Sequence, residues 1–144
     1  MICNNATLIY SSYRRVDENL NHLLDDFIAI DKVNYQRILY NCPIPMLTSM
    51  YNSAEIGKIY FPDVPLREDH AMWIELLKKI DYARAIEKPL GIYRIRKNSV
   101  SRNKFIIAIK QFKLYYNYLN FNLIQSTYYT LCWALNGLRK YGRI

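Results

Sequence analysis

The middle of this chain is organised by the stretch Leu66-Arg67-Glu68-Asp69-His70-Ala71-Met72-Trp73. From its last residue onward, apolar side chains recur at the spacing of one helix face, and charged side chains fall on the opposite face. The apolar positions are Trp73, Leu76, Leu77 and Ile80, and the charged ones are Glu75, Lys78 and Lys79. This pattern predicts an amphipathic helix that starts at Glu68 and Asp69 and turns Trp73 toward the core. Unpaired N–H groups and the helix dipole favour ionised carboxylates there, so the pair is either a structural cap or a chemically active pair.

Three further segments, read together with this helix, resemble a known family. They are Pro89-Leu90-Gly91-Ile92-Tyr93-Arg94-Ile95-Arg96-Lys97-Asn98-Ser99-Val100-Ser101 downstream, and Ile9–Asn19 and Asn41–Pro45 with Thr48–Tyr51 upstream. In this order the four segments are similar to the C-terminal half of family 2 glycosyltransferases of the GT-A fold. The resemblance covers nearly the whole chain. It implies an incomplete α/β, Rossmann-like GT-A domain.

The resemblance also implies a reaction, in which a hydroxyl of a growing surface glycan or lipopolysaccharide displaces the nucleotide from a nucleotide-sugar donor. Such a reaction needs a base to take the hydroxyl proton, and Asp69 matches the family's aspartate at the acceptor side. Glu68 would support or orient it, and His70 would contact the acceptor or be a surface residue. Arg94 and Arg96 are the cations expected to stabilise the diphosphate leaving group, with a solvated strand edge as their alternative.

The family's metal-binding half has no counterpart in this sequence. There is no Asp-x-Asp motif, and Asp25-Asp26 is expected in a solvated surface turn. Many relatives carry a histidine at the position of Arg96, and an arginine cannot ligate a metal. A divalent ion, Mg²⁺ or Mn²⁺, is therefore expected for full-length members, with its ligands largely missing here. Thr48, on the acceptor-side loop, is a further candidate substrate contact.

We therefore expect a truncated enzyme, inactive alone: a degenerate gene product, one half of a split gene whose separate N-terminal half is its partner, or a fragment. The alternative is a non-enzymatic remnant that binds a membrane surface or a partner. The 144 residues, 51% of them hydrophobic, predict an ordered domain. A sheet cut through its middle would expose apolar strand faces and an unpaired edge, so aggregation is expected.

Cysteine and histidine usage argues against a disulfide framework or a zinc site. Cys3, Cys42 and Cys132 are widely spaced and odd in number, and neither His22 nor His70 has a partner at metal-ligand spacing. We expect reduced thiols. The first residues lack the basic and apolar regions of a signal peptide, so a cytoplasmic location is predicted, peripheral on the inner face of the membrane.

Charged residues are distributed unevenly along the chain. Residues 1–87 carry nine basic and all twelve acidic residues, whereas residues 88–144 carry eleven basic and none acidic. The aromatic, basic tail has three interpretations: it lies on an anionic membrane surface, it packs on its own domain or another subunit, or it binds nucleic acid. The last is set aside because no nucleic-acid-binding module is recognisable. No apolar run approaches the roughly 18 residues that span a bilayer.

Local patterns predict the remaining elements. Strands are expected over 7–13, 46–51, 82–86 and 90–95. Helices are expected over 33–41, over 53–58 with Ser53 as cap and Gly57 as stop, from Ser101 toward Tyr118, and over 123–138 with Asn136-Gly137 near the end. Together they give an acceptor-side half-domain over residues 1–100 and a helical tail over residues 101–144.

Overall fold

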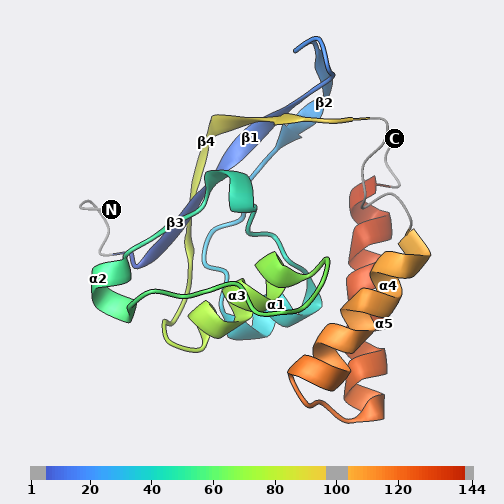
Figure 1. The fold of residues 1–144 in the computed structure, drawn as a ribbon. Coiled ribbons are helices and arrows are strands. Elements are labelled where there is room, and N and C mark those ends of the chain that lie inside the picture. The colour runs from blue at the N-terminus through green and yellow to red at the C-terminus, as the bar shows by residue number, and fades with distance from the viewer. Residues whose placement is uncertain (1–5, 97–103, 142–144) are drawn as a thin grey trace.

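The computed structural model describes residues 6–96 and 104–141, and it has an α/β architecture (Figure 1). A small sheet lies above a group of helices, and the last two helices stand together on one side. In chain order the elements are β1 Leu8–Val16, β2 His22–Phe27, α1 Tyr35–Tyr40, β3 Met50–Tyr51, α2 Ser53–Ile56, α3 Glu68–Leu77, β4 Arg84–Arg94, α4 Lys104–Lys113 and α5 Leu123–Tyr141. The α/β prediction is confirmed.

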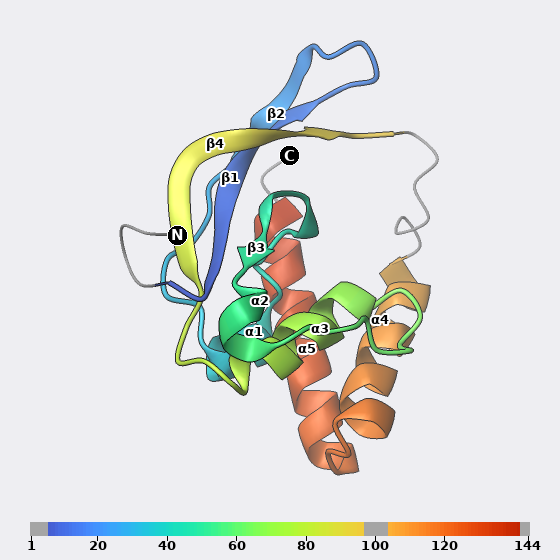
Figure 2. The same ribbon diagram turned by 60° about the vertical axis from the view of Figure 1, so that its left-hand side comes forward.

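Strand β1 is the centre of the sheet. It pairs antiparallel with β2 and β3 and parallel with β4, which joins it along almost its full length (Figure 2). The two predicted strands 82–86 and 90–95 are in fact this single strand. Its register with β1 shifts on both sides of Pro89, so the proline, which cannot donate a ladder hydrogen bond, sits at an irregularity rather than at a break.

The predicted strand over residues 46–51 is wrong for its first half. Met46–Thr48 forms a 3₁₀ turn, and only Met50–Tyr51 is extended. The Thr48 hydroxyl explains the difference, because it donates to the Ser11 carbonyl at 2.8 Å and accepts from the Ser11 N–H at 3.2 Å. The Thr48 hydroxyl thus binds the N–H and the carbonyl of Ser11, the two backbone groups that a paired strand would otherwise bind.

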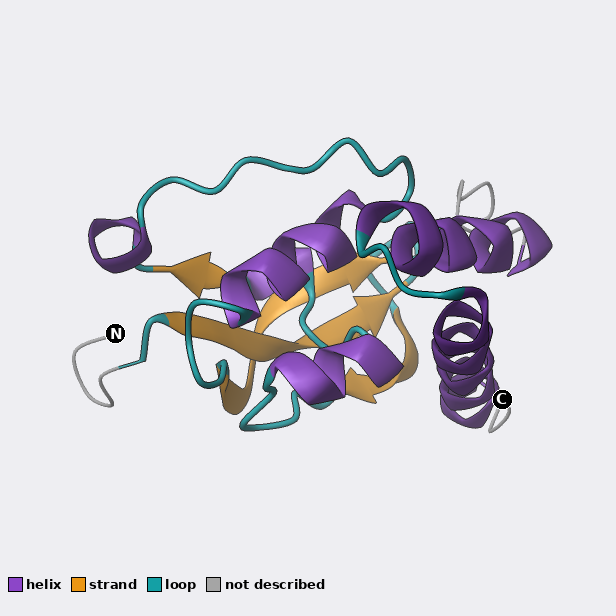
Figure 3. Cartoon of the chain, turned by 90° about the horizontal axis from the view of Figure 1, so that it is seen from below, coloured by secondary structure: helices purple, strands orange, loops and turns teal. Residues whose placement is uncertain are grey.

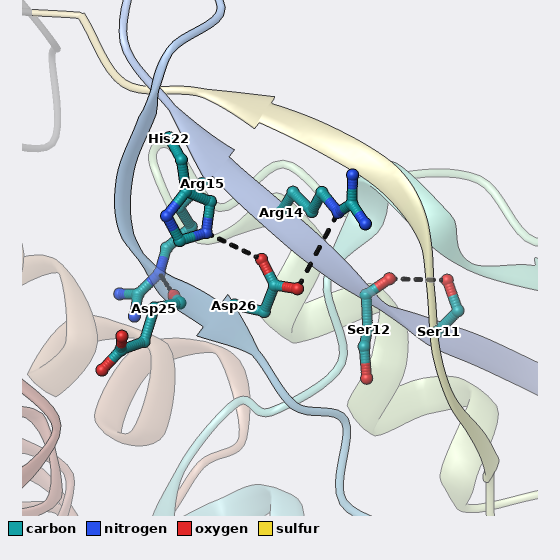
Figure 4. Close-up of polar contacts among 7 residues, drawn as sticks. All are labelled: Ser11, Ser12, Arg14, Arg15, His22, Asp25 and Asp26. Carbon is teal, nitrogen blue, oxygen red and sulfur yellow. Dashed lines mark hydrogen bonds and ion pairs between the residues drawn. The ribbon is translucent and has the colours of Figure 1, made fainter.

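Asp25 and Asp26 lie within β2, so the predicted surface turn is wrong about their backbone. The turn itself precedes them, where the Asp17 carboxylate accepts hydrogen bonds from the N–H groups of Asn19 and Asn21. Asp26 reaches His22 at 3.3 Å and Arg14 at 4.0 Å (Figure 4). These polar contacts hold the outer end of the hairpin.

Helix predictions hold better than strand predictions. α1 is shorter than expected, and Val33 instead forms an isolated bridge to Ala83. α2 ends at Gly57, whose φ of 76° suits a glycine, but its cap is the Asn52 side chain rather than Ser53. α5 does not end near Asn136-Gly137; it continues to Tyr141. The predicted helix start at Ser101 lies outside the described residues.

One hydrophobic core joins the sheet, α1, α3 and the tail helices. Trp73 is 1% exposed, which confirms it as a core residue. After α4 a π-helical turn, Leu114–Tyr118, carries the fully buried Leu114 and Tyr115 into the same core. The Tyr115 hydroxyl donates to the Leu39 carbonyl at 2.7 Å, and burial raises the Tyr115 pKa. The tail thus packs on its own domain, which is the second of its three interpretations. The division into two domains at residue 100 stays a prediction.

Candidate functional site

The first turn of α3 presents the carboxylate pair. Glu68 is exposed and Asp69 is half-buried, and both stand where the helix dipole favours negative charge. The residue at the cap position is Arg67, which makes no side-chain cap hydrogen bond. Asp69 Oδ1 accepts from the N–H of His70 at 2.7 Å. The predicted helix start is confirmed, and Asp69 has a fixed orientation.

Arg67, directly before the pair, is the residue that the sequence analysis missed. Its guanidinium lies 4.7 Å from the ring centroid of Trp133 on α5, and its Nε and Nη2 atoms are buried without a hydrogen-bond partner. Burial lowers the Arg67 pKa, while the charge of Asp69 acts in the opposite direction. A buried cation beside Asp69 supplies positive potential at this turn, and Trp133 fixes it from the tail.

His70 is fully buried, so the prediction of a surface residue is wrong. Its Nε2 lies 2.8 Å from the Ile38 carbonyl oxygen, and its Nδ1 faces Gln111 of α4. Burial lowers the His70 pKa from 6.5 to about 4, only partly opposed by the hydrogen bond to Ile38. A neutral, enclosed imidazole links α1, α3 and α4, and in this structure it is not accessible to a substrate.

Thr48 likewise makes internal contacts. Besides its two hydrogen bonds to Ser11, its methyl group lies against β4 at Gly91, where an added Cβ would come within 2.7 Å of Thr48 Cγ2. A glycine is therefore needed at position 91 for the turn to reach the strand. The hydroxyl of Thr48 holds the turn that follows the Pro43–Pro45 loop.

Arg94 and Arg96 lie at the far end of β4 and are exposed. They line an open hollow whose other walls are apolar: Leu20, Leu47, Ile92 and Tyr93. Among residues 6–96 and 104–141, no hydrogen bond or ion pair connects either arginine to Glu68 or Asp69. The two parts of the predicted site thus lie on different elements, one at a helix start and one at a strand end.

The described residues do not supply a metal site, because no cluster of three His, Cys, Asp or Glu side chains occurs among them. An Mg²⁺ or Mn²⁺ requirement stays a prediction. Among the described residues, Cys42 and Cys132 form no disulfide bond, and Cys3 lies outside the described residues. In the part of the chain that the structure covers, every helix is too short or too polar to cross a membrane.

Comparison with known proteins points to one class of enzyme, although no protein-family profile and no solved structure matches the chain. A putative teichuronic acid biosynthesis glycosyltransferase of Bacillus subtilis is 33% identical over 81% of this chain and 47% of its own length. The UDP-Glc:α-D-GlcNAc-diphosphoundecaprenol β-1,3-glucosyltransferase WfgD of Escherichia coli is 29% identical over 98% of this chain and 54% of its own length.

An uncharacterized glycosyltransferase of Haemophilus influenzae is 27% identical over 98% of this chain and 56% of its own length. The chain therefore spans about half the length of the curated relatives it matches. Since these relatives cover four fifths or more of the chain and share one enzyme type, the comparisons support a glycosyltransferase family for it.

Proposed function

We propose that this chain is the acceptor-side, C-terminal part of a family 2 glycosyltransferase of the GT-A fold, acting in the cytoplasm. With a donor-binding part, it would transfer a sugar from a nucleotide-sugar to a hydroxyl of a lipid-linked or polysaccharide glycan. The observation that carries the proposal is the similarity over 98% of the chain to a relative named for UDP-glucose and a diphosphoundecaprenol acceptor. The relative named for teichuronic acid biosynthesis supports the same substrate class.

In this proposal Asp69 is the base. The acceptor oxygen attacks the anomeric carbon, its proton passes to the Asp69 carboxylate, and the bond from that carbon to the nucleotide diphosphate breaks. The first turn of α3 supports this role, because the helix dipole favours negative charge there and the contact to the His70 N–H fixes the direction of the carboxylate. Glu68, beside it and exposed, would bind or orient the acceptor.

The negative charge of the leaving diphosphate needs cations. Arg94 and Arg96 are the residues proposed for this task, since exposed guanidinium groups at a strand end can bind phosphate oxygens in a bidentate way. The hydrogen bonds of Thr48 and His70 support positioning roles instead: Thr48 for the loop at residues 43–48 and His70 for the start of α3.

The proposal also requires a second part of the enzyme, which would bind the nucleotide-sugar donor. Within the described residues β4 pairs only with β1, and its side chains Ile86, Leu90 and Ile92 are 39%, 60% and 57% exposed. Apolar surface of this kind marks a binding face, which a nucleotide-binding half would cover. Such a half would also carry the metal ligands, so we expect the chain alone to be inactive.

The test uses the chain alone and the chain fused behind the unmatched half of the Escherichia coli relative, each with UDP-glucose, other sugar nucleotides and a lipid-diphosphate acceptor. We expect transfer only from the fusion. In the fusion, Asp69→Asn should lower kcat by about 10²- to 10⁴-fold, the usual contribution of a general base.

Asp63→Asn is the matched control, because Asp63 is an exposed aspartate six positions before Asp69 and should tolerate the same change. Full activity of the Asp69→Asn fusion would remove Asp69 from the mechanism. Turnover by the unfused chain would disprove the need for a second half. A folded fusion that is inactive in every assay would favour the non-enzymatic alternative.

A further inference from the structure

One row of side chains on helix α5 packs against the protein, and the opposite row is largely exposed. The inner face carries the buried Ser126, then Tyr129 in contact with the core, Trp133 beneath the Arg67 guanidinium, and Asn136, which donates to the Tyr40 carbonyl. These residues follow each other at intervals of three or four. They therefore lie in one row along the helix.

The opposite row is apolar and exposed. Ile124, Leu131 and Leu135 are 81%, 58% and 58% exposed. Tyr128, 52% exposed, lies in the same row, but its ring packs edge-to-face against Tyr40 of α1 at 6.2 Å. At about 100° per residue this row faces away from the inner row. A helix that needed only its core contacts would carry polar side chains here. From Leu123 to Leu138, however, α5 contains no charged residue.

Helix α4 repeats the arrangement. Its buried side is formed by Ile107 and Gln111, while Phe105 and Ile109 on the other side are 76% and 43% exposed. Two turns further, in the π-helical turn that follows α4, Tyr116 continues the exposed row at 48%. α4 contacts α5, and Figures 1 and 3 show the two helices together on one side of the molecule. We call the exposed rows of both helices the outer face.

The charge around the outer face selects its partner. Residues 88–144 contain eleven basic and no acidic side chains, and Lys104, Lys110 and Lys113 lie on α4 itself. Within the described part of the chain, none of these three lysines forms an ion pair. Two copies meeting through this face would bring cations against cations, whereas an anionic surface would neutralise them.

We propose that the outer face of α4 and α5 binds an anionic lipid bilayer. The helices lie in the interfacial layer, with the aliphatic side chains entering the headgroup region and the lysines contacting lipid phosphates. Neither helix is both long and apolar enough to cross the membrane. The proposal does not depend on sugar transfer, because the candidate base stands on α3.

The experiment is flotation of the purified chain with vesicles of phosphatidylcholine alone or of equal parts phosphatidylcholine and phosphatidylglycerol. We expect flotation with the anionic vesicles only, weakened by salt. Leu131→Gln with Leu135→Gln should weaken partitioning by at least about 10-fold through lost apolar area. Replacing Lys104, Lys110 and Lys113 by Gln should weaken it on the order of 100-fold.

Each variant has a control with the same chemical change elsewhere. Leu23→Gln with Ile28→Gln removes two side chains that are 50% and 57% exposed on the β2 segment. Gln at Lys32, Lys58 and Lys79 removes the same charge from exposed positions outside the tail. Far-UV circular dichroism checks that all variants fold.

Several results would overturn the proposal. One is equal flotation with neutral and anionic vesicles, and another is an equal loss in control and outer-face variants. A third is a lipid-free dimer, detected by sedimentation, that Leu131→Gln with Leu135→Gln dissociates while vesicle binding is unchanged. That result would assign the outer face to a second copy of the chain.

Discussion

Helix α3 and strand β4 are nearly equal in length and follow one another in the chain, yet they are covered very differently. On α3, Trp73, Ile74, Leu76 and Leu77 are at most 2% exposed. On β4, Ile86, Leu90, Ile92 and Tyr93 are 39% to 60% exposed. The helix is enclosed by α1, the sheet and the tail, whereas the strand is covered on few sides.

This difference distinguishes side chains that stabilise the fold from side chains that remain available to bind a partner. Apolar side chains that are already buried contribute to folding, and exposed ones contribute only when a partner covers them. β4 has exposed apolar side chains. That a divided sheet is the cause stays a prediction. Three predictions test the comparison in order of decreasing effect.

The largest effect should come from the same substitution made in both elements. Ile74→Ala on α3 removes a side chain that is 0% exposed, so we expect a loss of about 2–5 kcal/mol in the free energy of unfolding. Ile92→Ala on β4 removes one that is 57% exposed and should cost about 1 kcal/mol or less. Urea denaturation measures both. Equal losses would show that β4 is as well packed as α3.

A smaller effect is expected where β4 does make a close contact. Gly91→Ala places a methyl group 2.7 Å from Thr48 Cγ2, and Thr48 is held by its hydrogen bonds to Ser11. Overpacking of this kind should cost about 1–3 kcal/mol of unfolding free energy. Adding Thr48→Ser removes the obstructing methyl group but keeps the hydroxyl, so it should restore most of the loss.

The control for that prediction is Gly137→Ala on α5, where an added Cβ meets nothing within 4 Å. Alanine favours helix over glycine, so stability should rise by up to about 1 kcal/mol. Failure of Thr48→Ser to rescue Gly91→Ala would mean that the turn and the strand do not pack as the structure has them.

The third prediction concerns pH and the buried His70. The His70 pKa is about 4 when folded and near 6.5 when exposed, so below pH 6.5 the unfolded chain takes up a proton that the folded chain does not. The contribution of His70 is fully present above pH 6.5 and is lost as pH falls toward 4. From pH 7 to pH 5 the loss should be about 2 kcal/mol.

Urea denaturation at the two pH values measures this loss. His70→Gln should nearly abolish the difference between them. A pH dependence that persists in His70→Gln would place its origin in another group.

The sequence predicted the parts of the fold that depend on neighbours along the chain. α3 was placed correctly because its apolar spacing and its acidic start lie within three turns. Predictions failed where contacts between residues far apart in the chain determine the local structure. The segment at 46–51 was read as a strand, but the Thr48 hydroxyl binds Ser11, 37 positions away. The segments at 82–86 and 90–95 were predicted as two strands, but pairing with β1 joins them into one through Pro89.

The candidate site was likewise predicted from the sequence only in part. The motif itself pointed to Glu68 and Asp69 at a helix start, and the structure has them there. Nothing local showed that Arg67 would be buried against Trp133, 66 positions later, or that His70 would be enclosed by Ile38 and Gln111. Burial depends on which elements pack together, and no single segment contains that information.

The sequence by itself determined the α/β order, the helical tail, its excess of basic residues and the carboxylate pair at the start of α3, because these follow from composition and short-range periodicity. The tertiary structure decided which histidine loses contact with water, which arginine is buried next to Asp69, and which apolar residues of β4, α4 and α5 stay exposed. Each of these depends on contacts between residues far apart in the chain, whose free energy is set by packing and desolvation rather than by local propensity.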